Sequence, residues 1–373
     1  MSSESQLALR PQSQLAQLLV QRIREAGKIT FHDWMAEALY HPTLGYYNRS
    51  DLKRWGRSGD YRTSPERSEL FAATFARYFV SLYRELGQPA EFTIVEIGAG
   101  NGEFAAGVLA TLKRSYSDIF NSTRYEIVET SRVSRRVAAE RLHGFSDHVE
   151  FAESHDLRPR EPGIVFTNEL LDAFPIHRLT ILNGRLAELF VSLNSEGSFI
   201  WTVDDPSSQE LVDAYRSHVP QLTEGQVIEL NLGISDWFRR IAQILKSGYL
   251  ITVDYGHEAE SLYSSTEHPH GTLRAFRSHQ FVEDVLSDPG EYDITSSVDW
   301  TFVKSEGKQY GFELDQFIGL DRFLMQAGVL EELEFRLTDA KSAAETSALT
   351  TSAREMILPG GMASSFQVLV QRR

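Results

Sequence analysis

A predicted strand, a turn with three glycines and a predicted helix follow one another around residue 100, and this order constrains the fold most. Residues 92–97 form an apolar run typical of a buried strand, and residues 104–112 have the apolar spacing of a helix. The glycines between them are Gly98, Gly100 and Gly102. Glycine adopts positive φ and lets a ligand approach the backbone closely. Strand, glycine turn and helix in this order bind nucleotide-like ligands at the carboxyl edge of a sheet.

The charge of this turn indicates which ligand it holds. The spacing G-x-G-x-G is one residue shorter than the dinucleotide fingerprint G-x-G-x-x-G. No lysine or arginine occurs between Arg84 and Lys113, whereas Glu96 and Glu103 flank the glycines. S-adenosylmethionine carries a positive sulfonium and no phosphate, so it suits the turn better than NAD; a turn that only packs helix on strand is the alternative. The residues expected to hold the cofactor here are Glu96, Gly98, Gly100 and Gly102.

Further cofactor contacts are predicted after the next two strands. Residues 125–128 and 149–152 have the apolar character of these strands. Glu129 ends the first of them, where a carboxylate can accept hydrogen bonds from both ribose hydroxyls. Asp156 and Leu157 follow the second, where a polar and an apolar side chain would hold the adenine.

Strands continue to alternate with helices beyond this point. Residues 163–167 and 249–253 are predicted as the fourth and fifth strands. Residues 366–370 are predicted as a last strand that pairs antiparallel near the sheet edge. This alternation predicts a Rossmann-like α/β fold, in which a mainly parallel twisted sheet has helices on both faces.

The remaining segments are predicted to decorate this fold. Residues 1–90 have the pattern of an N-terminal helical cap with a glycine-rich loop, and residues 91–373 form the core. We expect insertions in the core near residues 178–230 and 256–330. The first insertion contains an inserted hairpin, whose turn is predicted at residues 194–197.

The methyl acceptor is expected near the ends of strands four and five. Glu169 and Asp172 follow strand four and, being three residues apart, would share a face of a helical turn. Two such carboxylates could grip a guanidinium, whose charge must be neutralised before a nitrogen can attack. The alternative is a helix N-terminus with Asn168 as its cap and acids favoured by the dipole. Asn168 could also orient an amine, and Asp254 with Tyr255 is similarly placed after strand five.

Composition excludes several other kinds of protein. The 373 residues contain no cysteine, which excludes disulfides, thiolate metal sites and cysteine nucleophiles. The formal net charge of −15 disfavours nucleic acid as a partner. No run reaches the ~18 apolar residues of a membrane span, and residues 1–14 show neither a signal core nor an Arg-rich presequence. We therefore expect a cytoplasmic protein, and the histidine spacings predict no metal site.

Taken together, these residues make the chain similar to the MidA-like class I methyltransferases, a family that includes a mitochondrial complex I assembly factor with protein arginine methyltransferase activity. The matching blocks are residues 29–31, 38–40, 45–47, 58–66, 96–102, 168–173, 248–256, 271–274, 293–295 and 298–300. The chain departs from the pattern at Ala99, where many relatives have proline, and in residues 358–363, which lack the glycine usual after methionine.

This resemblance implies a class I methyltransferase fold, S-adenosylmethionine as donor and an arginine of a partner protein as acceptor. It favours an active-site role for Glu169 and Asp172 over helix capping. It also implies that the glycine-rich loop of the cap folds near the cofactor. The loop residues expected to contact the cofactor are Gly59, Thr63, Ser64 and Pro65.

Three functions stay distinct at this level. The first is a protein methyltransferase acting on arginine, and the second is a small-molecule methyltransferase with the same core. The third is a cofactor-binding assembly factor with little catalysis, in which the insertions form a partner interface. The sequence leaves the acceptor, the number of methyl groups added and a homo-oligomeric state open.

Overall fold

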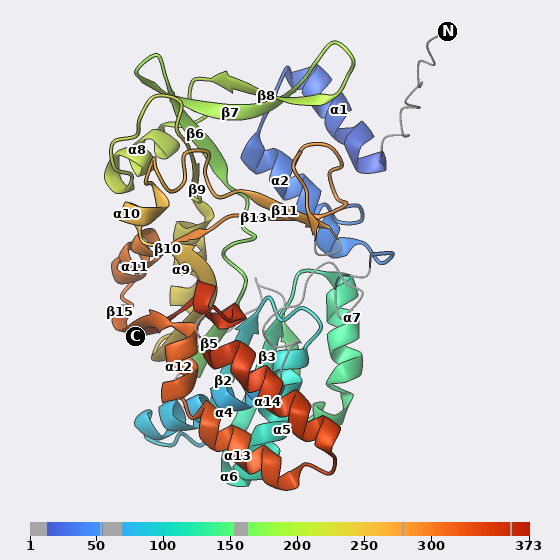
Figure 1. Ribbon diagram of the computed structural model, residues 1–373, viewed down its shortest axis with the longest axis vertical. Coiled ribbons are helices and arrows are strands. Elements are labelled where there is room, and N and C mark those ends of the chain that lie inside the picture. Colours follow the sequence, from blue (N-terminus) through green and yellow to red (C-terminus); the bar gives the residue numbers. More distant parts are fainter. Residues whose placement is uncertain (1–12, 53, 55–68, 153–162, 278–279, 359) are drawn as a thin grey trace.

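One large sheet forms the lower part of the molecule in Figure 1. The computed structural model describes residues 13–52, 54, 69–152, 163–277, 280–358 and 360–373. In these residues the sheet has the strand order β15-β16-β10-β5-β2-β3-β4. The strands are β2 (Phe92–Ile97), β3 (Thr123–Val128), β4 (Val149–Ala152), β5 (Gly163–Asn168), β10 (Gly248–His257), β15 (Glu313–Gly319) and β16 (Phe366–Arg372), and the short β14 (Val298–Asp299) pairs with the end of β10.

The strand order reverses between β2 and β5, and this reversal sets the position of the site. The chain runs outward from β2 through β3 to β4, then returns to the other side of β2 as β5 and continues to β10. These five strands are parallel, whereas β16 runs antiparallel to β10, which confirms the predicted sheet and its last strand. Ligands of open α/β sheets bind at such a reversal, beyond the carboxyl ends of the strands.

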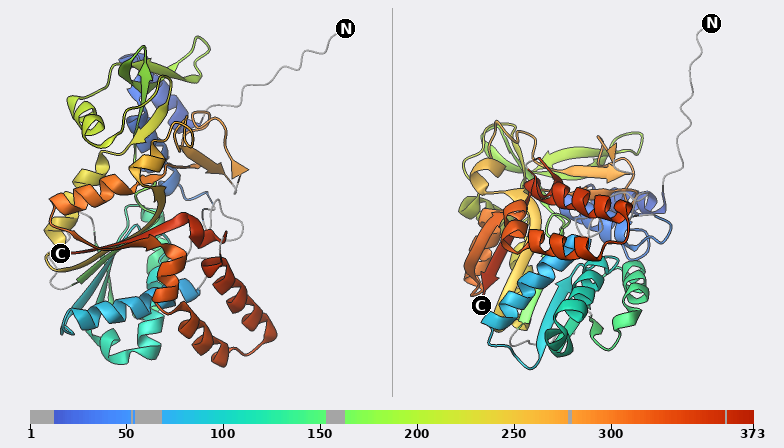
Figure 2. Two further views of the ribbon diagram at one scale, coloured as in Figure 1. Left: turned by 60° about the vertical axis from the view of Figure 1, so that its left-hand side comes forward. Right: turned by 60° about the horizontal axis from the view of Figure 1, so that its bottom comes forward.

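Alternate residues of each strand face opposite layers of helices. Ile94 packs with α4 (Glu69–Glu85) and α5 (Glu103–Ser115), whereas its neighbour Val95 packs with α9 (Gly233–Ile244) and α11 (Trp300–Gln309). The C-terminal helices lie on the side of α4 and α5 (Figure 2). The helices on this side also include α6 (Ser117–Ser122), α7 (Arg132–Arg141), α12 (Leu320–Gln326), α13 (Val329–Asp339) and α14 (Ala343–Ile357).

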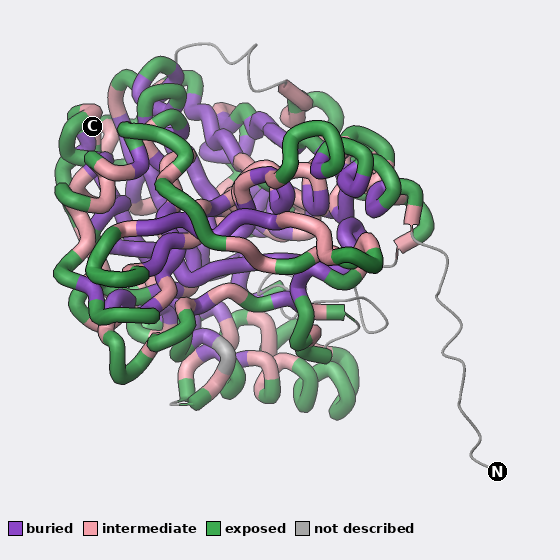
Figure 3. Tube along the Cα trace, turned by 90° about the horizontal axis from the view of Figure 1, so that it is seen from above, coloured by how far each residue is buried: buried purple, intermediate pink, exposed green. Residues whose placement is uncertain are grey.

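A second group of elements lies over the carboxyl edge of the sheet, and we call it the upper layer. It joins the N-terminal helices to the first insertion, because β1 pairs antiparallel with β7 (Figure 1), and to the second insertion, because Tyr47 is hydrogen-bonded to Asp293. Its elements are α1 (Gln14–Ala26), β1 (Ile29–Thr30), α2 (Phe31–Tyr40), η1 (Tyr46–Asn48), β6 (His177–Leu182), β7 (Arg185–Leu193), β8 (Phe199–Asp204), α8 (Gln209–His218), β9 (Val227–Leu230), α10 (Ala259–Leu262), β11 (Arg274–Arg277), β12 (Gln280–Phe281) and β13 (Asp293–Thr295). Seen from above, buried segments run through this layer and exposed ones surround it (Figure 3).

Local signals fix the ends of these elements as the sequence indicates. The Thr30 side chain accepts a hydrogen bond from the Asp33 N–H and begins α2, and Gly27 ends α1 with a φ of 82°. The predicted hairpin is formed by β7 and β8, with Asn194 accepting backbone hydrogen bonds within its turn. The division of the chain at residue 90 stays a prediction; α4, which precedes it, packs against the central sheet.

None of the helices in the described parts of the chain combines the length and the apolar character that a bilayer crossing requires. Two short 3-10 helices complete the element list, η2 (His143–Phe145) and η3 (Met362–Ser365).

Gly102 begins α5 where this helix touches α7, and we predict that its replacement destabilises the fold. In Gly102→Ala the added Cβ would lie 2.9 Å from the Ala138 Cβ at a φ of 73°. Gly184→Ala is a matched control, because it has the same φ of 73° and no atom within 4 Å of the added Cβ. Urea unfolding should show a loss of about 2–4 kcal/mol for Gly102→Ala and about 1 kcal/mol for the control. Equal losses would show that contact with α7 is unimportant.

Candidate active site

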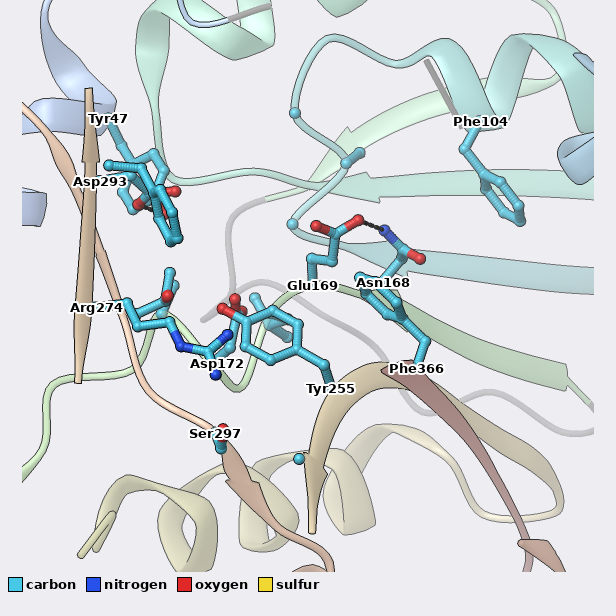
Figure 4. Close-up of a pocket in the computed structure, with 18 of the residues that line it drawn as sticks. Tyr47, Phe104, Asn168, Glu169, Asp172, Tyr255, Arg274, Asp293, Ser297 and Phe366 are labelled. Atoms are coloured by element: carbon cyan, nitrogen blue, oxygen red, sulfur yellow. Dashed lines mark hydrogen bonds between the residues drawn. The ribbon is translucent and has the colours of Figure 1, made fainter. Parts of the chain in front are cut away.

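A cavity of about 720 Å³ lies between the carboxyl edge of the central sheet and the upper layer (Figure 4). The sheet contributes the glycine turn and residues at or just beyond the carboxyl ends of β3, β5 and β10. The upper layer contributes α2, η1, β11 and β13. Its volume is that of a small-molecule site. The predicted site residues that line it are Glu96, Gly98, Gly100, Glu129, Asn168, Glu169 and Asp172.

Glu129 joins the glycine turn to the end of β3. One of its carboxylate oxygens accepts a hydrogen bond from the Gly100 N–H at 2.9 Å, and the other accepts one from the Ser131 N–H at 2.7 Å. The side chain is 9% exposed and faces the cavity. Each carboxylate oxygen has a second lone pair, so Glu129 can still accept hydrogen bonds from a ligand's hydroxyls.

Glu96 is the buried carboxyl beneath the glycine turn. The Tyr125 hydroxyl donates a hydrogen bond to it at 2.6 Å. Burial, together with the nearby Glu129, raises the pKa of Glu96 to about 8. Glu96 therefore holds a proton at neutral pH. The second acid that flanks the turn, Glu103, forms an ion pair with Arg141 at 3.1 Å. The turn is consequently less negative than its sequence suggests, and Glu129 is the carboxylate at its rim.

Some predicted cofactor contacts lie outside the described residues. They are Gly59, Thr63, Ser64, Pro65, Asp156 and Leu157. Gly102 lies within the described chain but does not line the cavity; it ends the turn and begins α5.

The segment after β5 is a turn, and the helical geometry expected there is wrong. No helix begins between Asn168 and the next strand, β6. Glu169 instead has a φ of 52°, a left-handed conformation that costs about 1–3 kcal/mol for a residue other than glycine. Both Glu169 and Asp172 nevertheless face the cavity (Figure 4). Because no helix begins here, Glu169 and Asp172 cannot be explained as acids that stabilise a helix N-terminus capped by Asn168.

Asp254, near the carboxyl end of β10, binds the backbone of this turn. One of its carboxylate oxygens accepts hydrogen bonds from three successive backbone N–H groups, those of residues 170, 171 and 172, at 3.2, 2.9 and 3.4 Å. The other accepts one from the Tyr255 N–H at 2.9 Å. Asp254 is fully buried. Both oxygens of its carboxylate are hydrogen-bonded to backbone N–H groups, and it is the neighbouring Tyr255 that lines the cavity.

Two buried acceptor atoms, on residues that line the cavity, have no hydrogen-bond donor among the described residues. They are the Asn168 Oδ1 and the Asp172 Oδ1. The Asn168 amide donates to Glu169 at 3.1 Å, which directs its oxygen away from that partner (Figure 4). The Tyr255 hydroxyl lowers the pKa of Asp172. Burial first, and then the Asp254 carboxylate, raise the pKa of Asp172 well above its ordinary value.

The upper layer adds side chains that the sequence did not single out. The Tyr47 hydroxyl donates to Asp293 at 2.6 Å across the cavity wall, and the Tyr40 hydroxyl donates to the Ala173 carbonyl at 2.9 Å. Arg274 reaches the cavity from β11 (Figure 4). Tyr40, Tyr47, Arg274 and Asp293 all lie in the sequence blocks shared with the MidA-like family. That resemblance could have indicated them as site residues, whereas residue spacing alone assigned them no role. Among the described residues, no group of three or more His, Asp and Glu side chains is arranged to hold a metal ion.

The comparisons with known proteins agree with this geometry. A family model described as "Putative S-adenosyl-L-methionine-dependent methyltransferase" matches residues 74–318, more than half of the chain. The chain belongs to this family. A Burkholderia thailandensis protein crystallised with S-adenosyl-homocysteine is 27% identical, with a TM-score of 0.85 over 96% of this chain and 92% of that one. The predicted class I methyltransferase fold, donor and family resemblance are confirmed.

Curated relatives carry more specific names. The Drosophila melanogaster "Protein arginine methyltransferase NDUFAF7 homolog, mitochondrial" is 28% identical over 319 residues, which cover 78% of this chain and 69% of that protein. The human "Protein arginine methyltransferase NDUFAF7, mitochondrial" is 26% identical, over 82% of this chain and 72% of that protein. The predicted cytoplasmic location is contradicted, because these relatives are mitochondrial. That prediction depends on the lack of an apolar run long enough for a membrane span and on the composition of residues 1–14, and neither observation specifies a compartment.

The site fits the donor of this family. When bound, S-adenosylmethionine supplies a methyl group on a positively charged sulfur, ready for attack by a nucleophile. The glycine turn and the Glu129 carboxylate would hold its nucleoside part, since they offer close backbone approach and free acceptor lone pairs.

Glu129→Gln should weaken donor-product binding about 10–100-fold. The amide replaces one acceptor oxygen by an NH₂ group, which opposes either the Gly100 or the Ser131 N–H and cannot accept from a ribose hydroxyl. Calorimetric titration with S-adenosylhomocysteine measures this. Glu150→Gln, the same change at an exposed position of the adjacent strand β4, should bind normally. Unchanged affinity in Glu129→Gln would remove Glu129 from the cofactor site.

Glu96 should make the wild-type protein less stable as pH rises. Its folded pKa of about 8 exceeds the ordinary value of 4.5, so between these values the unfolded chain has lost a proton that the folded chain keeps. This contribution lowers the free energy of unfolding by up to about 1.4 kcal/mol per pH unit. Urea unfolding at pH 5.5, 7.0 and 8.5 should show a smaller decline for Glu96→Gln than for wild type or for the exposed Glu313→Gln. Parallel declines in all three proteins would contradict the assignment.

Proposed function

We propose that the protein transfers a methyl group from S-adenosylmethionine to an arginine side chain of a partner protein. The observation that carries this proposal is a pair of buried oxygens without a hydrogen-bond donor, on Asn168 and Asp172, two residues that line the cavity beside Glu169. A buried acceptor without a donor is costly, so a ligand that brings N–H groups is favoured there. The names of the curated relatives support the same acceptor.

A guanidinium matches the hydrogen-bond acceptors of Asn168, Glu169 and Asp172 better than an amine does. It carries five N–H donors in a planar fork, which can reach two carboxylates and an amide oxygen at once. Asp172 and Glu169 would pair with the fork, and the Asn168 Oδ1 would accept from a further N–H. Because Asp172 is buried, entry of a cation favours its charged form and so draws the acceptor in.

The chain's own residues then orient the nitrogen and take up a proton. Carboxylates on two sides of the guanidinium localise its positive charge away from the attacking nitrogen. A bond forms between this nitrogen and the methyl carbon as the carbon–sulfur bond breaks, and the nitrogen loses one proton. Asp172 can receive that proton, because burial raises its pKa.

The sharpest test separates residues that act on the methyl acceptor from residues that bind the methyl donor. Glu169→Gln and Asp172→Asn should lower kcat by at least about 100-fold, because each removes a charge that faces the acceptor. S-adenosylhomocysteine affinity should change less than about threefold in both. Glu150→Gln should retain activity. Full turnover in Glu169→Gln would contradict the proposed role.

The acceptor itself is identified with labelled donor. Purified protein, labelled S-adenosylmethionine and cell extract should give label in a protein band, and digestion should yield methylarginine by mass spectrometry. Label confined to small metabolites would instead show a small-molecule methyltransferase. No labelled product at all, with normal donor binding and biological activity retained in Glu169→Gln, would identify an assembly factor.

A further inference from the structure

We propose that Asp254 is a positioning residue for the acceptor site, acting through the turn that presents Glu169 and Asp172. The inference rests on the proposed function and deepens it, because it says how two acids are held at a site where neither has a helix to support it. Asp254 does not line the cavity and is fully buried. It therefore acts on the acceptor only through the residues that it holds.

The first argument is the way in which the carboxylate binds the backbone. Three successive N–H groups, those of residues 170–172, converge on one oxygen of Asp254. Such a concave arrangement of N–H groups is an anion-binding nest, here filled by a side chain of the adjacent strand. It fixes the backbone between Glu169 and Asp172 and thus the distance between the two acids.

The second argument is the left-handed conformation of Glu169. The Glu169 N–H donates to the Val253 carbonyl at 2.9 Å, so this residue is bound to β10 on its N-terminal side. Asp254 binds the N–H groups on its C-terminal side. A strained residue persists when its surroundings over-determine it. Two adjacent residues of β10 therefore hold the φ of 52° that turns the Glu169 side chain toward the cavity.

The third argument is electrostatic and gives a readout that a purely structural role would not move. The groups facing Asp172 are Asp254 and Tyr255 from β10, Glu169 from its own turn, Asp293 from β13 and Tyr40 from α2. The Asp254 charge raises the pKa of Asp172, and the Tyr255 hydroxyl lowers it. Removal of either group should therefore shift the acid limb of the pH–rate profile, in opposite directions.

The test compares variants in the full-length protein with a peptide or protein acceptor. Asp254→Asn should lower kcat about 10–100-fold, as expected for misplaced acids, and leave S-adenosylhomocysteine affinity within about threefold. Its acid limb of kcat/KM should move to lower pH. Tyr255→Phe should move the limb to higher pH. Asp254→Glu keeps the charge but displaces it, so kcat should fall without a shift to lower pH; this variant serves if Asp254→Asn does not fold.

Asp299→Asn is the matched control. Asp299 is another buried carboxylate that binds backbone, accepting from the Phe302 N–H at 3.0 Å, but it does not line the cavity. The Asp299→Asn variant should lose stability and keep the wild-type kcat and pH profile.

The inference would be overturned if Asp254→Asn kept the wild-type kcat and the wild-type acid limb of the pH–rate profile. A loss of donor affinity as large as the loss of kcat would overturn it too. If Glu169→Gln also keeps full turnover, the proposed function itself fails; if only the Asp254 variants do, this inference alone fails.

Discussion

The reversal of strand order between β2 and β5 is the constraint on which the site depends. Crossover connections leave the sheet in opposite directions at this point, so a crevice opens beyond the carboxyl ends of the two strands. The glycine turn after β2 and the acidic turn after β5 meet there because the two strands are hydrogen-bonded neighbours. Donor and acceptor residues, about 70 positions apart in the chain, are thus brought to one cavity by the sheet alone.

The turn after β5 is also where the two layers of the molecule are joined. Its carbonyl groups accept hydrogen bonds from Tyr40 of α2 and from the Ser296 N–H beside β13, while Asp254 binds its N–H groups from the central sheet. Every polar group of a buried turn needs such a partner. The upper layer therefore supports the acceptor site as well as covering it, and its part of the cavity wall comes from α2, η1 and the second insertion.

The sequence predicts the parts of this protein that obey a local rule. Strand periodicity and glycine spacing identified the sheet, the glycine turn and the position of Glu129, because each depends on neighbouring residues. The conformation of Glu169 was predicted wrongly, since an i, i+3 pair of acids indicates a helix and only contacts with β10 enforce a left-handed turn. Asp293 and Tyr47 lie 246 residues apart, and their contact depends on how the insertions fold back over the sheet, which spacing does not show.

The place of β16 in the sheet has a consequence for how the protein is made. This strand, the last in the chain, lies between β10 and β15 and supplies hydrogen bonds to both. Until β16 has been synthesised, β10 presents an open apolar edge, and β15 has no partner among the described strands of the sheet. Unpaired edges of this kind recruit strands of other chains. Nascent copies are therefore exposed to aggregation from the time that β10 is synthesised until β16 is in place.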